Sequence, residues 1–236
     1  RPPEFQDALY KGKWEEAYEI LSQTNDFPEF TGRFCPALCE KSCVLKLAID
    51  DPVTIREDEA AIIEAAFREG YIKSRTYPRN GKKVAVVGSG PAGMAAANQL
   101  NRMGYEVTVF EKDEYVGGLL RFGIPNFKLN KAIIDRRVDI MAAEGITFKT
   151  NAPVDVEHLP EGFDAYCICT GTPQARDLDI PGRNLKGIHF ALEMLAQQNR
   201  VLGGQAFSKE ERIIAKGKHV LVIGGGDTGS DCIGTS

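Results

Sequence analysis

The sequence predicts an α/β fold, and three observations lead to this class. A valine-rich run at 84–87 leads directly into a glycine triplet, and the run 220–223 leads into a second one. A short apolar strand followed by such a triplet and a helix is typical of a dinucleotide-binding turn. Residues 1 to about 50 carry little β pattern. We therefore expect two Rossmann-like dinucleotide-binding domains, the second truncated, after a small helical domain.

Each glycine of the first triplet has a separate physical role. Gly88 permits a tight turn after the strand, and Gly90 lacks the Cβ that would keep a pyrophosphate away. Gly93 allows the following helix to pack closely on the strand. That helix is expected to run from about Pro91 to Met103, because proline suits a first helical position and Gly104 follows.

The segment after this helix completes the dinucleotide signature. Residues 106–110 read as a second strand, and Glu111 follows it, 18 residues beyond Gly93. A carboxylate at this place is positioned to bind the ribose hydroxyls of the adenosine half. A glycine-rich loop in another α/β fold is the alternative interpretation. The strand, triplet, helix, second strand and acid all occur in order, which favours dinucleotide binding.

Composition excludes several other classes of function. The 236 residues are 43% hydrophobic and 26% charged, with 29 basic against 33 acidic side chains. This balance gives no reason to expect nucleic acid or an anionic membrane as a partner. The sequence shows neither a membrane-span pattern nor a signal peptide, and six cysteines without one suggest a reducing compartment. We expect a cytoplasmic location, and we interpret the chain, which begins at Arg1, as a piece of a longer polypeptide.

The N-terminal region contains three closely spaced cysteines. Residues 13–22 predict an amphipathic helix, and 25–34 read as a turn-rich approach. Cys35, Cys39 and Cys43 then place three thiols in nine residues, in the spacing C-x3-C-x3-C. Such thiolates suit a four-iron cluster or zinc, either of which needs one more ligand from elsewhere. Three buried free cysteines are the alternative, and the spacing by itself does not decide.

Further elements follow the same reading. Residues 56–69 predict a helix, and the polar run 74–83 predicts a linker. Beyond Glu111 we expect a tight double-glycine turn at 117–118 and a helix at 130–144. Two strands are expected after it, at 146–150 and 165–169. Cys167 and Cys169 alternate on the last strand, and we expect them to be core residues because they lack a redox C-x-x-C spacing.

The opening pattern returns near the end of the chain. After an expected helix at 190–199, residues 219–223 predict a strand, and 224–229 fit the glycine signature again. Eighteen residues remain from His219 onward, against roughly thirty for a complete βαβ unit. The position that separates NADH from NADPH lies beyond them. We expect domains at 1–78, 79–175 and 176–236.

These motifs in combination resemble the small (beta) subunit family of bacterial glutamate synthase. The resemblance rests on residues 25–33, the cysteine triplet, the two glycine signatures and the run Gly117-Gly118-Leu119-Leu120-Arg121-Phe122-Gly123-Ile124-Pro125. It implies that the first signature holds FAD, through Gly88, Gly90, Pro91, Ala92, Gly93, Glu111, Gly118, Leu119, Thr170 and Gly171. It implies that the second holds NADPH, through Gly224, Gly226, Asp227, Thr228 and Gly229. It assigns a 4Fe–4S cluster to Cys35, Cys39 and Cys43, with a further cysteine from upstream.

The resemblance also implies a role in electron input. Hydride would pass from NADPH to FAD, and single electrons would pass through iron–sulfur centres to a large (alpha) subunit that makes glutamate from 2-oxoglutarate and glutamine. We identify no side chain as a catalytic acid, base or nucleophile. The nearest alternative is a related module of a dihydropyrimidine dehydrogenase or a ferredoxin–NADP oxidoreductase. A disulfide reductase and a non-catalytic scaffold are the others.

Overall fold

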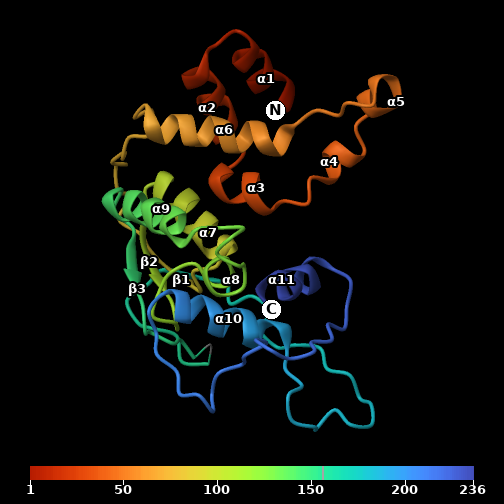
Figure 1. The fold of residues 1–236 in the computed structure, drawn as a ribbon. Helices are drawn as coiled ribbons and strands as arrows, with labels where there is room; N and C mark the ends of the chain where they lie inside the picture. The colour runs from red at the N-terminus through yellow and green to blue at the C-terminus, as the bar shows by residue number, and fades with distance from the viewer. Residues whose placement is uncertain (156) are drawn as a thin grey trace. The chain divides into compact units, whose positions relative to one another are not determined.

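The computed structural model describes residues 1–155 and 157–236. The chain divides into two compact units. The first contains residues 1–77 and 139–144, and the second contains residues 78–138 and 145–236. Figure 1 shows that helices make up the first unit and that the sheet belongs to the second. No helix within the described residues is long and apolar enough to cross a membrane.

The first unit is held together by apolar faces of three helices. Phe5, Ala8, Ala17, Leu21 and Ile62 form one buried cluster that joins the first, second and sixth helices. The predicted helices at 13–22 and 56–69 are confirmed to within one residue at each end. The helices of this region are α1 (Pro2–Tyr10), α2 (Trp14–Ser22), α3 (Pro28–Phe34), α4 (Leu38–Lys41), α5 (Leu45–Ile49) and α6 (Ile55–Arg68).

The expectation of a turn-rich loop at 25–34 is wrong, because most of this run forms helix α3. Pro28 occupies the first turn of α3, where the missing N–H costs nothing, and Phe30 is fully buried. A Cβ on Gly32 would lie 2.9 Å from the Cβ of Ala60 in α6. The glycine thus permits a close helix–helix contact, and this packing outweighs its poor helix propensity.

The second unit is built on a parallel sheet with the strand order β3-β2-β1-β4. All adjacent strands run parallel, with Val86 opposite Val109 on one side and Cys167 on the other. This order places a topological switch point between β1 and β4, the place where Rossmann-like sheets bind ligands at the carboxyl ends of the strands. The strands are β1 (Lys83–Val87), β2 (Glu106–Phe110), β3 (Thr147–Lys149) and β4 (Ala165–Ile168).

Helices follow the strands as the sequence predicts. The expected helices from Pro91, near 130–144 and near 190–199 are all present. Glu193 accepts the backbone N–H of Phe190 at 3.1 Å and so helps to start the helix at 191. The helices are α7 (Pro91–Arg102), α8 (Leu119–Phe122), α9 (Lys131–Ala143), α10 (Ala191–Leu202) and α11 (Asp227–Thr235).

Two expectations about strands need correction. Residues 219–223 are not a strand, and Leu221 and Ile223 are 85% and 71% exposed. A strand needs a hydrogen-bonded neighbour, and within the described residues none pairs with this segment. Cys167 and Cys169 are half-buried rather than core residues, because β4 is the last strand of the sheet in the described chain. Their sulfur atoms lie 3.6 Å apart, and burial raises the pKa of Cys169 to about 11.

Candidate functional site

The first glycine turn connects β1 to α7, and its three glycines have different surroundings. Gly88 has φ +101°, and a Cβ there would lie 2.4 Å from the carbonyl oxygen of Cys169. A Cβ on Gly93 would lie 1.9 Å from the carbonyl oxygen of Gly88. A Cβ on Gly90 would meet no atom within 4 Å. Two glycines are therefore required by the fold itself, whereas Gly90 borders open space.

The N-terminus of α7 lies at this open space. Gly90 is the N-cap residue and Pro91 begins the helix, while no side chain within the described residues caps its first turn. Pro91 and Ala92 are exposed. Unbonded N–H groups and the positive end of the helix dipole favour an anion here. The turn therefore fits the pyrophosphate of a dinucleotide.

Glu111 is buried at the end of β2 and is held by the turn itself. Its Oε2 accepts the backbone N–H of Ser89 at 3.1 Å and also the Ser89 hydroxyl. Its Oε1 accepts the N–H of Asp113 at 2.9 Å. Each carboxylate oxygen can accept more than one hydrogen bond, so Oε1 keeps capacity for a ribose hydroxyl. The carboxylate is thus fixed in place next to the glycine turn.

Ser89 is a site residue that sequence reasoning did not single out. It is fully buried, and its hydroxyl also accepts the N–H of Gly117 at 2.9 Å. One side chain therefore joins the glycine turn, the acidic strand end and the double-glycine loop. The only signal in the sequence is a hydroxyl residue between Gly88 and Gly90, where a small side chain of any kind also fits the pattern.

The double-glycine loop lies directly against the first turn. Gly118 has φ +51°, and a Cβ there would lie 3.0 Å from the Cα of Gly90. Leu119 begins α8 and is half exposed. On the other side, the Cα of Thr170 would lie 3.3 Å from a Cβ on Gly88. The structure therefore gathers the two loops at the carboxyl ends of β1 and β4, and the exposed Gly171 continues the second.

Arg121 and Lys131 hold the double-glycine loop and the turn after it, and no sequence pattern predicts either role. Arg121 is buried, donates to the carbonyl of Val116 at 2.7 Å and pairs with Asp135. The ammonium of Lys131 donates to the carbonyls of Leu120 and Ile124, at 3.1 and 2.6 Å. Burial, assisted by the nearby guanidinium, lowers the pKa of Lys131 to about 8.

The second glycine turn repeats the backbone of the first, although its strand is not formed. Gly224 has φ +124°, as Gly88 has +101°. A Cβ on Gly229 would lie 2.5 Å from the carbonyl oxygen of Gly224, the same contact that Gly93 makes in the first turn. Gly226 is the N-cap of α11, and the exposed Asp227 and Thr228 begin the helix. The turn therefore forms without a flanking strand.

Of the three N-terminal cysteines, Cys39 lies in the short helix α4, and Cys35 and Cys43 lie just before and after it. Cys35 and Cys43 are half-buried and Cys39 is exposed. Hydrogen bonds from the backbone N–H groups of Val53 and Leu45 lower the pKa of Cys43, which favours the thiolate that soft metals bind. Within residues 1–155 and 157–236, however, no three potential ligands are already gathered around one point. The thiols fit a cluster in chemistry, and their assembly around one stays a prediction.

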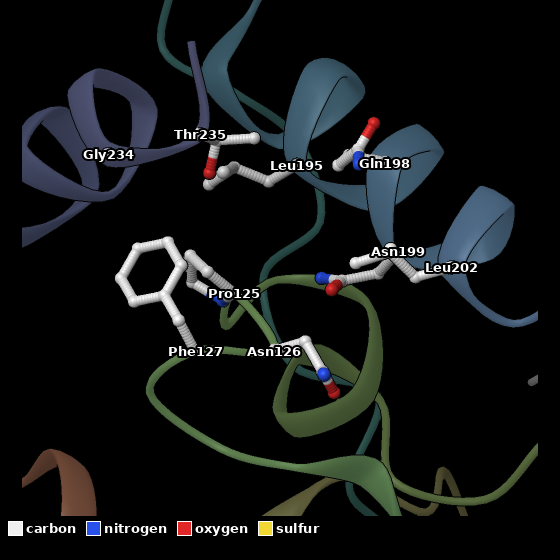
Figure 2. Close-up of a pocket in the computed structure, with 9 residues that line it drawn as sticks. All are labelled: Pro125, Asn126, Phe127, Leu195, Gln198, Asn199, Leu202, Gly234 and Thr235. Atoms are coloured by element: carbon white, nitrogen blue, oxygen red, sulfur yellow. The ribbon is translucent and has the colours of Figure 1, made fainter.

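One pocket of the second unit is lined by residues outside both glycine triplets. Its volume is about 320 Å³. Figure 2 shows the Pro125–Phe127 loop on one side, four side chains of α10 on another and the end of α11 closing a third. The residues that line it are Pro125, Asn126, Phe127, Leu195, Gln198, Asn199, Leu202, Gly234 and Thr235.

The comparison with protein families agrees with the geometry of the turns. Residues 82–235 match the family described as pyridine nucleotide-disulphide oxidoreductase. The chain belongs to this family. Residues 1–71 match the model described as dihydropyrimidine dehydrogenase domain II, 4Fe-4S cluster, so the first unit is a helical domain of the 4Fe–4S type.

Individual relatives confirm the resemblance drawn from the motifs. The chain is 51% identical over 240 residues to the NADPH glutamate synthase small chain of Bacillus subtilis, covering 99% of this chain and 48% of that one. It is 51% identical over 242 residues to the corresponding chain of Mycobacterium tuberculosis, with 99% and 49% covered. A glutamate synthase (NADH) of Schizosaccharomyces pombe is 48% identical over 237 residues, with 98% and 11% covered. The chain is a homologue of the small chain and spans about half the length of the bacterial relatives it matches.

Proposed function

We propose that the chain is part of an electron-input subunit of glutamate synthase. In this proposal, hydride passes from NADPH to FAD, and electrons pass through 4Fe–4S clusters to a large subunit that forms L-glutamate from 2-oxoglutarate and glutamine. The observation that carries the proposal is a pair of glycine turns with similar backbone geometry. They occur in a chain that is 51% identical in sequence to an NADPH glutamate synthase small chain. Two such turns suit two dinucleotides, and a flavin with a nicotinamide is the pair that transfers hydride.

The residues divide into three proposed sites. FAD would contact the first turn and its neighbouring loops, through Gly88, Gly90, Pro91, Ala92, Gly93, Glu111, Gly118, Leu119, Thr170 and Gly171. NADPH would contact the second turn, through Gly224, Gly226, Asp227, Thr228 and Gly229. Cys35, Cys39 and Cys43 would ligate a 4Fe–4S cluster together with a thiolate from elsewhere in the polypeptide.

The chain's own residues would bind and orient these groups. When bound, FAD accepts two electrons together and releases them singly, which the protein cannot do by itself. The amide groups at the start of α7 would receive the pyrophosphate, and Glu111 would receive the ribose through Oε1. Ser89 would hold that carboxylate in place. The proposed domain boundaries remain 1–78, 79–175 and 176–236, and the proposed location is the cytoplasm.

The experiment uses the full-length parent protein together with its large subunit. Denaturation followed by mass spectrometry identifies the released nucleotides, and recovery of NAD without any flavin would contradict the assignment of FAD to the first turn. Cys35→Ser then removes one proposed thiolate ligand. Reduction of an artificial acceptor by NADPH should survive in this variant, whereas glutamate synthesis should collapse, because electrons no longer reach the large subunit.

Two outcomes would change the proposal. Unchanged NADPH-driven glutamate synthesis in Cys35→Ser would show that this thiol is not on the electron path. Acceptor reduction without glutamate synthesis in the unmodified complex would favour the second candidate, a related module of the dihydropyrimidine dehydrogenase or ferredoxin–NADP oxidoreductase type. The match of residues 1–71 to a dihydropyrimidine dehydrogenase domain is the observation that favours this candidate.

A further inference from the structure

Helix α11, which starts at the second glycine turn, is docked on the loop that follows α8. The end of α11 and the Pro125–Phe127 loop face each other across the pocket in Figure 2. A Cβ on Gly234 would lie 2.9 Å from the ring of Phe127. The helix therefore approaches this loop as closely as a glycine allows, and a larger residue would force the ring aside.

A partly buried ion pair fixes the same contact. The ammonium of Lys128 pairs with Oδ1 of Asp231, and the carboxylate side chain is only 12% exposed. Water screens a pair at this depth much less than a surface pair. Removal of one partner would leave the other charge poorly solvated and without compensation. Lys128 lies in the loop that follows α8, next to the proposed flavin site, and Asp231 lies one turn into α11, which follows the second glycine turn. The pair therefore joins the regions of the two glycine turns.

Helix α10 is anchored to the segment that follows β2, which contains the double-glycine loop. The side-chain amide of Asn199 is buried and donates to the carbonyls of Phe122 and Ile124, both at 3.0 Å. The guanidinium of Arg200 pairs with Asp113 at 3.0 Å and Glu114 at 3.2 Å, directly after the ribose acid Glu111. The segment from Asp113 to Ile124, which contains the double-glycine loop, is therefore tied to one helix, and α11 packs on that helix.

We propose that Lys128 and Asp231 are a positioning pair that fixes the second dinucleotide turn relative to the first, so that hydride transfer occurs at the right distance. The inference rests on the proposed function and deepens it, because it assigns to two residues outside the glycine signatures a role in the reaction. Hydride transfer depends steeply on alignment, and a displacement of about 1 Å can cost on the order of 100-fold in rate. Neither residue needs to touch a nucleotide for this role.

The test uses the full-length protein with bound FAD. The variants are Asp231→Asn, Lys128→Met and the two combined. Glu106→Gln is the control, because it removes an exposed ion pair with Lys83, 3.4 Å apart, at the amino ends of β1 and β2, opposite the strand ends that carry the glycine turn. Four quantities are measured: flavin per chain, NADP⁺ affinity, the rate of flavin bleaching at saturating NADPH, and amide hydrogen exchange in residues 227–235.

We expect each single variant to lower the saturated bleaching rate by about tenfold or more, while NADP⁺ affinity changes less than about threefold. The double variant should be no slower than the single ones, because the second change removes a partner that is already lost. Exchange in α11 should be faster in every pair variant. The control should match the unmodified protein in all four measurements.

Three results would overturn the inference. The first is a bleaching rate in the single variants within twofold of the control. The second is a fall in rate fully explained by loss of flavin or of NADP⁺ affinity, which would mean structural support only. The third is additive losses in the double variant. If one single variant fails to fold, the other decides by the same criteria. Failure of the proposed function itself is distinct, because the unmodified protein would then show no bleaching by NADPH at all.

Discussion

The substitution Gly90→Ala separates a glycine needed by the ligand from those needed by the fold. Gly90 has φ −63° and ψ 179°, a backbone conformation that alanine adopts without strain. A Cβ there meets no protein atom within 4 Å. The structure therefore predicts that the methyl group is harmless to the protein and projects into the space where the pyrophosphate would bind.

The substitution should raise the stability of the flavin-free protein and lower its affinity for FAD. The unfolding free energy of the flavin-free protein should rise by about 0.4–1 kcal/mol, because alanine restricts the unfolded chain. The affinity for FAD should fall by about 1–3 kcal/mol, roughly 5- to 150-fold, because the methyl group overpacks the phosphate contact. Urea unfolding of the full-length apoprotein measures the first quantity, and FAD titration by fluorescence measures the second.

Gly93→Ala is the matched control. Its Cβ would lie 1.9 Å from the carbonyl oxygen of Gly88, so the backbone must move and stability should fall in the absence of any ligand. Flavin affinity in Gly90→Ala equal to that of the unmodified protein would refute the reasoning, since it would show that this face of the turn is not where the cofactor binds. A large loss of apoprotein stability in Gly90→Ala would refute the steric argument.

Three further outcomes are expected. Ser89→Ala removes a buried hydroxyl with two partners and should lower the unfolding free energy by about 2–3 kcal/mol in urea titrations, against no change for the exposed Ser74→Ala. Because burial lowers the pKa of Lys131 to about 8, the folded state releases this proton before the unfolded state does. The free energy of unfolding should therefore rise with pH from about 8 towards the ordinary lysine pKa of 10.5, and Lys131→Met should abolish that rise in pH-dependent unfolding. In the 236-residue chain, amide hydrogen exchange should be much faster at 220–223 than at Val84–Val87. Equal protection of the two segments would contradict the finding that residues 219–223 form no strand.

Several features followed from local sequence because short-range physics fixes them. Proline after Gly90 and glycine after the helix define the ends of α7, and both glycine turns form with similar dihedral angles. The second turn does so even without a flanking strand. Hydrophobic runs likewise predicted β1 and β2 to within one residue of their observed bounds.

Other features required contacts between distant residues, and no local pattern encodes those. Residues 28–34 become a helix because Gly32 can approach Ala60, and 219–223 fails as a strand because nothing described pairs with it. Ser89 matters because the fold brings it to Glu111 and Gly117.

By itself, the sequence determined the α/β class, the alternation of strands and helices along the chain, and the positions of both glycine turns. These depend on residues close together in the chain, where backbone sterics and helix capping act. Only the tertiary structure decided that Glu111 is held by a serine of the turn, and that Lys128 reaches Asp231. Those partners are 22 and 103 residues apart, and packing of the sheet and its helices brings them together.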